Sequence, residues 1–104
     1  MTLEDERLLT FVRELRKTFP DRLKKLILFG SRARGDYSEE SDYDFLLILD
    51  RVDAQTKGQV DELAGKMLLD YGAVITAIPL SQADLERMCF EPFIMNVQKE
   101  GILL

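Results

Sequence analysis

Two short apolar runs, separated by a polar segment, constrain the fold of this chain more than any other feature. The runs cover residues 26–29 and 45–49, and both consist of leucine, isoleucine and phenylalanine. Runs this short and this apolar are typical of strands with both faces covered. The polar segment begins with Gly30-Ser31 and ends with residues 42–44, so we expect both of its ends to lie at one edge of a sheet.

Asp42 and Asp44 stand one residue apart at the start of the second run. Side chains alternate between the faces of a strand, so both carboxylates point the same way, while Tyr43 and Phe45 point the other way. Two ionised carboxylates this close repel each other, and a hard cation such as Mg²⁺ removes that cost by binding both. A D-x-D pair taken alone is more often a solvated strand end. Its position after a glycine-serine turn favours a metal site.

The turn itself has the residues that a phosphate group needs. Gly30 lets the backbone approach a ligand closely, and backbone N–H groups in such a turn favour anions. The hydroxyl of Ser31 can donate a hydrogen bond to a phosphate oxygen. Arg32 and Arg34 bring guanidinium groups suited to phosphate, and either one can face the nucleotide or the solvent. The turn therefore predicts a nucleotide site beside the carboxylates.

Composition excludes several classes of function. A net charge of −5 argues against a groove for long nucleic acids, which bind mainly through phosphate neutralisation. The absence of histidine excludes Ser-His-Asp catalysis and histidine-bound metals, and leaves carboxylate-bound Mg²⁺. No apolar run approaches the roughly 20 residues of a membrane span. The acidic N-terminus lacks a signal-peptide pattern, so we expect a cytoplasmic protein.

The pattern of elements predicts one α/β domain over residues 1–104, with a small mixed sheet and flanking helices. The short link between the first two strands favours an antiparallel pair, and the helix before the third strand favours a parallel crossover. We expect Thr2 to cap the first helix. The expected helices cover residues 3–18 and 54–71 and begin after Ser81 and at Pro92; the expected strands cover 24–29, 42–49 and 73–80, with a turn or short helix at 31–34.

The run from Gly30 to Asp36, followed by residues 41–44, resembles the signature of the minimal nucleotidyltransferases of the DNA polymerase beta-like superfamily. The resemblance implies the palm-like fold of that superfamily. It also implies that Gly30 and Ser31, with Arg32 or Arg34, hold the triphosphate of ATP, and that Asp42 and Asp44 bind Mg²⁺ and are catalytic. The expected reaction transfers AMP to a hydroxyl group of a partner protein, as in antitoxins that modify and bind a helical HEPN-type partner.

The chain departs from that family at a third acid, which active relatives carry on the third strand. Here that strand has no acid, and Thr76 is the expected occupant of the position. Asp36, Glu39 or Glu40 from the loop could replace it. The alternative hypothesis is therefore a weak or inactive antitoxin subunit that binds nucleotide and partner without turnover. The apolar tail, residues 102–104, either docks on the domain or contacts a partner, and a homodimer stays open.

Overall fold

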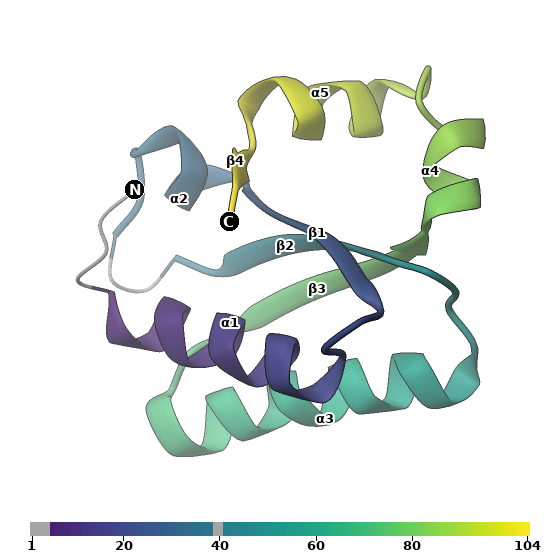
Figure 1. The fold of residues 1–104 in the computed structure, drawn as a ribbon. Helices are drawn as coiled ribbons and strands as arrows, with labels where there is room; N and C mark the ends of the chain where they lie inside the picture. Colours follow the sequence, from purple (N-terminus) through teal and green to yellow (C-terminus); the bar gives the residue numbers. More distant parts are fainter. Residues whose placement is uncertain (1–4, 39–40) are drawn as a thin grey trace.

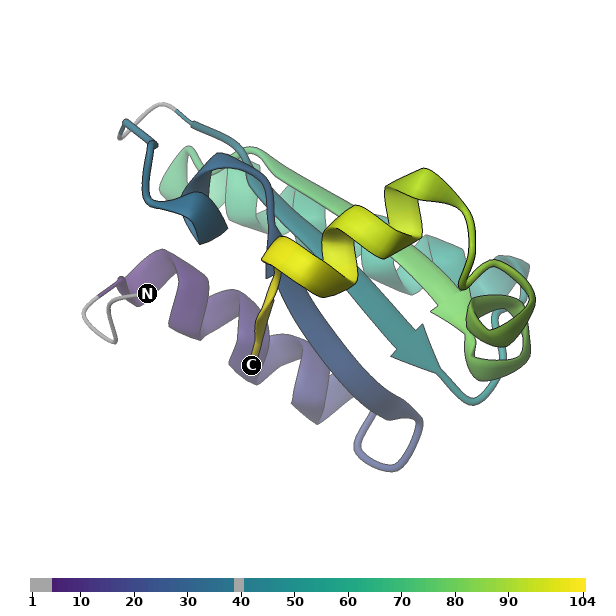
Figure 2. The ribbon, with the colours of Figure 1, turned by 90° about the horizontal axis from the view of Figure 1, so that it is seen from above.

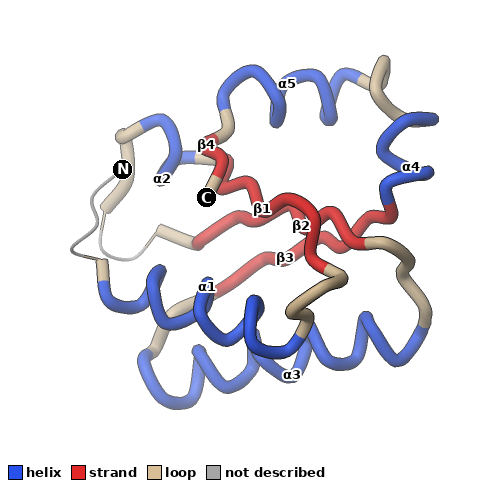
Figure 3. Tube along the Cα trace, viewed as in Figure 1, coloured by secondary structure: helices blue, strands red, loops and turns tan. Residues whose placement is uncertain are grey.

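The computed structural model describes residues 5–38 and 41–104, which form a four-stranded mixed sheet with helices on both faces (Figures 1 and 3). The strand order is β3-β2-β1-β4. The elements are α1 (Glu6–Thr18), β1 (Leu23–Phe29), α2 (Ser31–Arg34), β2 (Tyr43–Leu49), α3 (Ala54–Tyr71), β3 (Ile75–Ser81), α4 (Gln82–Arg87), α5 (Pro92–Glu100) and β4 (Ile102–Leu103). This architecture confirms the predicted fold class.

Helix α1 begins at Glu6, because the carboxylate of Asp5 caps it. The Oδ1 atom of Asp5 accepts a hydrogen bond from the backbone N–H of Leu8 at 3.0 Å, as in a standard N-cap. The predicted cap, Thr2, lies outside the described residues. Helix α3 begins in the same way, with Asp53 accepting from the N–H of Thr56 at 2.8 Å.

The strand pairing follows the predicted directions. Strand β1 runs antiparallel to β2, and β2 runs parallel to β3 through the crossover helix α3. Strand β3 begins at Ile75 rather than at the predicted Ala73, because the strand pairing starts only at the Tyr43–Ile75 pair. The C-terminal tail docks on the domain: β4 pairs with β1 through Ile102 and Leu103.

Two apolar clusters cover the two faces of the sheet. One cluster joins α1 and α3 to the sheet and includes Phe11 and Phe45, whose ring centroids lie 5.0 Å apart. The other joins α5 to the opposite face and includes Ile94 and Leu46. Residues 45–49 of β2 are at most 1 % exposed, which confirms the prediction that this run is covered on both sides. Figure 2 shows α5 lying across the strands on its own side of the sheet.

The described residues include no helix with the length and hydrophobicity that a membrane crossing requires.

Candidate functional site

The predicted site residues meet where β1 ends and β2 begins. The antiparallel register pairs Phe29 with Asp44, so the turn after β1 lies directly against the carboxylate. Gly30 has a φ of 76°, a region that side-chain-bearing residues rarely adopt. A Cβ atom on Gly30 would also overlap Oδ2 of Asp44. Glycine is required here both by its backbone conformation and by the close approach of the carboxylate.

Strand β2 begins at Tyr43, one residue later than predicted, so Asp42 immediately precedes the strand and only Asp44 lies within it. Asp44 lies on the α5 face of β2 with Leu46, while Tyr43 is buried on the α1 face. Burial raises the pKa of the Asp44 carboxyl, and the neighbouring charge of Asp42 raises it further. A divalent cation would relieve both effects, since carboxylate oxygens are its preferred ligands. The donor set therefore fits Mg²⁺.

Among the described residues, no third acid completes the pair. The parallel register places Thr76 of β3 directly beside Asp44, at the position where the sequence predicted it, and its side chain is exposed. Across residues 5–38 and 41–104, no three acidic, histidine or cysteine side chains come close enough together to hold a metal ion. Of the loop acids considered as replacements, Glu39 and Glu40 lie outside the described residues. Asp36 is engaged with Arg34 at 3.4 Å.

The half of the site that is predicted to bind phosphate is the start of α2. Ser31 is the first residue of this helix, and the first hydrogen bond in the helix runs from the N–H of Ala33 to the carbonyl of Gly30 at 3.1 Å. The N–H groups of Ser31 and Arg32 precede that bond, and N–H groups at a helix start favour an anion. These backbone donors follow directly after Phe29, the residue of β1 that pairs with Asp44.

Arg34 faces the same side of the molecule as Asp44. Its charge lowers the pKa of Asp44 in opposition to burial and to Asp42. Its guanidinium lies 3.8 Å from the carboxylate of Glu100 on α5. Arg34 and Glu100 border an open cleft of about 310 Å³ between α2 and α5. The cleft is lined by Phe29, Gly30, Arg34, Phe93, Asn96, Val97 and Glu100.

Arg32 points to the opposite side of the turn. Its side chain is 5 % exposed, and its guanidinium carbon lies 3.8 Å from the ring centroid of Tyr43 and 4.8 Å from that of Tyr37. Its Nε and Nη2 atoms donate to the backbone carbonyls of Ser41 and Ser38 at 3.1 and 3.3 Å. Of the two arginines that the sequence left open, Arg34 is the one that borders the cleft.

Sequence reasoning missed Asp5 as a neighbour of the site. Its Oδ2 atom accepts the hydroxyl proton of Tyr43 at 2.8 Å and lies 3.6 Å from Nη1 of Arg32. The capping position is the only sequence signal that Asp5 carries, and that signal says nothing about a partner 38 residues away.

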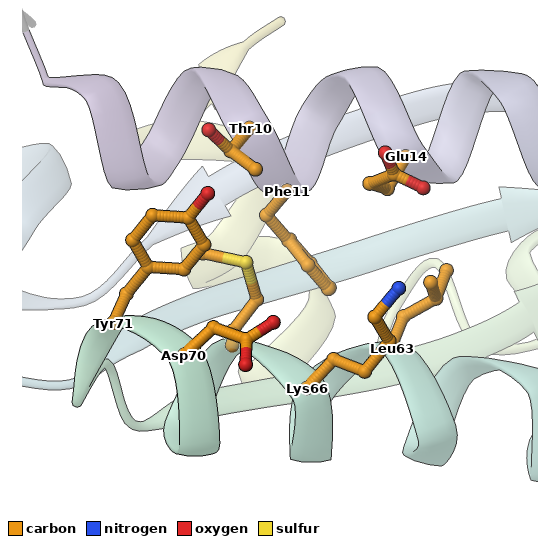
Figure 4. Close-up of a pocket in the computed structure, with 8 residues that line it drawn as sticks. Thr10, Phe11, Glu14, Leu63, Lys66, Asp70 and Tyr71 are labelled. Carbon is orange, nitrogen blue, oxygen red and sulfur yellow. The ribbon is translucent and has the colours of Figure 1, made fainter.

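A second cavity, of about 100 Å³, lies between α1 and α3 (Figure 4). In the close-up, side chains from both helices converge on it, including Glu14 and Lys66. It contains none of the predicted site residues, because it lies on the face covered by α1 and α3, whereas Asp44 lies on the α5 face. Asp70, the acid nearest in sequence to the third strand, lines this cavity rather than the carboxylate pair. We assign the cavity no role in the chemistry.

Comparison with known proteins agrees with this geometry. The family model of the nucleotidyltransferase domain matches residues 6–103. A candidate protein adenylyltransferase of Methanocaldococcus jannaschii, MJ0604, is 44 % identical over 101 residues, which are 97 % of each chain.

Solved structures share the fold at lower identity. A nucleotidyltransferase from Sulfolobus solfataricus aligns with a TM-score of 0.60 and 24 % identity, over 94 % of this chain and 76 % of that one. The MNT antitoxin complex with a tri-AMPylated HEPN toxin of Shewanella oneidensis aligns with a TM-score of 0.56 and 18 % identity, over 93 % of this chain and 70 % of that one.

Proposed function

The chain belongs to the nucleotidyltransferase domain family, and from that premise we propose that it is a Mg²⁺-dependent enzyme that transfers AMP from ATP to a hydroxyl group of a partner protein. The observation that carries this proposal is the packing of Gly30 against Asp44, which joins a phosphate-binding turn to a carboxylate pair. Phosphoryl transfer depends mainly on positioning and charge neutralisation, and both are available from such a site.

Each site residue has a proposed role in this reaction. Asp42 and Asp44 would hold Mg²⁺, which supplies charge neutralisation along the triphosphate when it is bound. The backbone at Gly30 and Ser31 would bind the phosphates, and Arg34 would offset their charge from the cleft. The acceptor hydroxyl oxygen would attack the α-phosphorus, the bond from that phosphorus to the bridging oxygen would break, pyrophosphate would leave, and the hydroxyl proton would pass to solvent. Thr76 cannot accept the acceptor proton as a carboxylate would, so we assign it no part in deprotonation.

A helical HEPN-type protein is the proposed partner and acceptor. Support comes from the likeness in fold to an MNT antitoxin in complex with a tri-AMPylated HEPN toxin. The high identity to a candidate protein adenylyltransferase supports AMP as the transferred group. Since the reaction consumes ATP, we propose the cytoplasm as its location.

The test is intact-mass spectrometry of a co-expressed HEPN-type protein. With the wild-type chain, the partner should gain the mass of one or more AMP groups, and Asp42→Asn or Asp44→Asn should abolish the gain. The matched control is Asp61→Asn, an exposed acid on α3 outside the site, which should leave the gain intact. Undiminished AMP transfer by both site variants would reject the assignment.

The second candidate is a binding subunit without turnover, and Thr76 beside Asp44 is the observation that favours it. In that case a stable complex would form with no added mass in any sample. Calorimetric titration with Mg²⁺ and the non-hydrolysable analogue AMP-PNP then measures whether the site binds a nucleotide. If the wild-type chain binds AMP-PNP and Asp44→Asn does not, the subunit holds a nucleotide. If the wild-type chain does not bind it either, Asp42 and Asp44 have no nucleotide ligand.

A further inference from the structure

We propose that Asp5, Arg32 and Tyr43 form a positioning cluster that holds the carboxylate pair from the opposite face of β2. The inference rests on the proposed function, because it assigns these three residues a role in the metal site formed by Asp42 and Asp44. It also gives Arg32 a role other than phosphate binding. We call these three residues the Tyr43 cluster.

Tyr43 connects the cluster to the site because it stands between the two aspartates in sequence. Its ring is 1 % exposed and stands on the face of β2 that packs toward α1. Its backbone N–H donates to the carbonyl of Val74 at 2.9 Å, and its hydroxyl donates to Asp5 at 2.8 Å. The main chain and the side chain of the intervening residue are therefore both fixed, which restricts the directions that the flanking carboxylates can take.

Asp5 uses its two carboxylate oxygens for two different tasks. The Oδ1 atom caps α1 by accepting from the N–H of Leu8, and the Oδ2 atom accepts from Tyr43. The same Oδ2 atom lies 3.6 Å from Nη1 of Arg32. The start of β2 is thereby fastened to the first turn of α1, which is itself held in the core through Leu8 and Phe11.

Arg32 fastens the loop that leads into Asp42. It stacks on the Tyr43 ring and donates to the carbonyls of Ser38 and Ser41, one of which immediately precedes Asp42. A forked guanidinium holds two carbonyls and one carboxylate at once, which the point charge of a lysine cannot reproduce. To reach a phosphate group, Arg32 would have to leave all of these contacts. The geometry therefore favours a positioning role.

Orientation of the carboxylates before the metal arrives is the expected benefit. Residues that fix the ligands of a metal commonly change its affinity by tenfold or more when they are replaced. Loosening the cluster should thus weaken metal binding without removing any metal ligand or any phosphate donor.

The test uses three variants that each remove one link and keep the rest. Arg32→Lys keeps the charge and removes the fork, and Tyr43→Phe keeps the ring and removes the hydroxyl. Asp5→Ser keeps a capping side chain for α1 but is too short to reach Tyr43. The readouts are the Kd of Mn²⁺ from electron paramagnetic resonance and the Kd of tripolyphosphate at saturating Mg²⁺ from calorimetry. Each variant should raise the Kd of Mn²⁺ about tenfold and change that of tripolyphosphate less than about twofold, because saturating metal compensates.

Two controls separate positioning from general loosening. Arg22→Lys removes a similar fork at the far end of the sheet, and Asp53→Ser alters the cap of α3. Both should lower the melting temperature and leave the Kd of Mn²⁺ unchanged.

Several outcomes would overturn the proposal. Weaker tripolyphosphate binding with unchanged Mn²⁺ binding in Arg32→Lys would make Arg32 a phosphate ligand. Unchanged Mn²⁺ affinity in all three variants would reduce the cluster to a structural feature, and equal losses in the controls would do the same. Failure of the proposed function is distinguishable, because then the wild-type chain and Asp44→Asn bind Mn²⁺ equally poorly.

Discussion

An arginine joins strands β1 and β2 at each end of the pair, and the two ends differ in whether the arginine contacts the acid at the strand end. Before β1, Arg22 donates to the carboxylate of Asp50 at 2.9 Å and to the carbonyl of Arg51 at 2.8 Å, just after β2. After β1, Arg32 reaches loop carbonyls just before β2 in the same manner. Both arginines also lie over an aromatic ring, that of Phe19 at one end and that of Tyr43 at the other.

The difference lies in where the acids stand. At the far end, Asp50 accepts a hydrogen bond from Arg22, and this bond lowers the pKa of Asp50. At the site end, the buried arginine pairs with Asp5, and Asp44 has a raised pKa. An arginine therefore neutralises Asp50 at one end, while the arginine at the other end leaves Asp44 outside its contacts, where the proposed cation could bind it. The two ends thus share an arginine over an aromatic ring and differ in which acid that arginine contacts. At the far end it is Asp50, and at the site end it is Asp5 rather than Asp44.

The largest expected effect comes from Gly30→Ala at the site end. Alanine would need a strained backbone at φ 76° and would overlap the Asp44 carboxylate, so we expect a loss of about 3 kcal/mol in unfolding free energy. Gly35→Ala is the matched control, with φ 86° and no atom within 4 Å of the added Cβ, and should cost about 1 kcal/mol. Urea unfolding measures both, and equal losses would show that Asp44 does not constrain the turn.

Thr76→Asp should give the next largest effect, because it adds a carboxylate directly beside Asp44. We expect tighter Mn²⁺ binding and an increase in transfer rate of about 10²-fold, the lower end of what a general base contributes. Thr76→Asn is the control, since it has similar size without charge. An unchanged Mn²⁺ affinity in the aspartate variant would mean that this position does not face the metal.

Arg22→Ala tests the far end. The loss of its bonds to Asp50, Arg51 and Thr56 should lower the unfolding free energy by about 1–2 kcal/mol. Because the acids at this end are not part of the site, Mn²⁺ affinity should stay as in the wild-type chain. A weakened Mn²⁺ affinity would contradict the separation of the two ends and make the β1–β2 pair a single unit.

The smallest effects are opposite changes with pH. The pKa of Asp44 is raised by burial and by Asp42, so its contribution to stability is present at low pH and is lost as the pH rises through the folded-state pKa. The pKa of Asp50 is lowered by Arg22, so its contribution is present at neutral pH and is lost as the pH falls.

In metal-free buffer at neutral pH, Asp44→Asn should therefore raise the melting temperature, and Asp50→Asn should lower it. Both differences should shrink toward acidic pH, as followed by circular dichroism. Two variants that shift the melting temperature in the same direction at neutral pH would remove the electrostatic part of the comparison.

Much of the fold follows from local patterns in the sequence. The covered run at residues 45–49, the antiparallel pair and the parallel crossover all reflect short-range periodicity and link lengths, and the structure confirms them. The position of Thr76 beside Asp44 was expected from the family resemblance, and the strand register confirms it. The roles of Asp42, Asp44, Gly30 and Ser31 in binding remain predictions.

The direction of Arg32 could not be read from the sequence. Its spacing from Arg34 fits a phosphate site equally well for both residues, and only the packing of Tyr43 against α1 draws Arg32 to the other face. The cap at Asp5 was missed for a related reason: Thr2 and Asp5 are both suitable capping residues, and the bond to Tyr43 distinguishes Asp5. Whether the tail docks was likewise decided by a long-range contact, the pairing of β4 with β1.

The bond between Asp5 and Tyr43 has a further thermodynamic consequence. It joins the first turn of α1 to Tyr43, which stands between Asp42 and Asp44 in sequence, and Asp44 lies on the other face of the sheet. If a protein that binds the start of α1 changes the metal affinity, linkage requires that the metal change the affinity for that protein by the same factor. The hydrogen bond on the α1 face, together with the backbone of Tyr43, would then let the occupancy of the proposed metal site be sensed on the opposite face of the sheet.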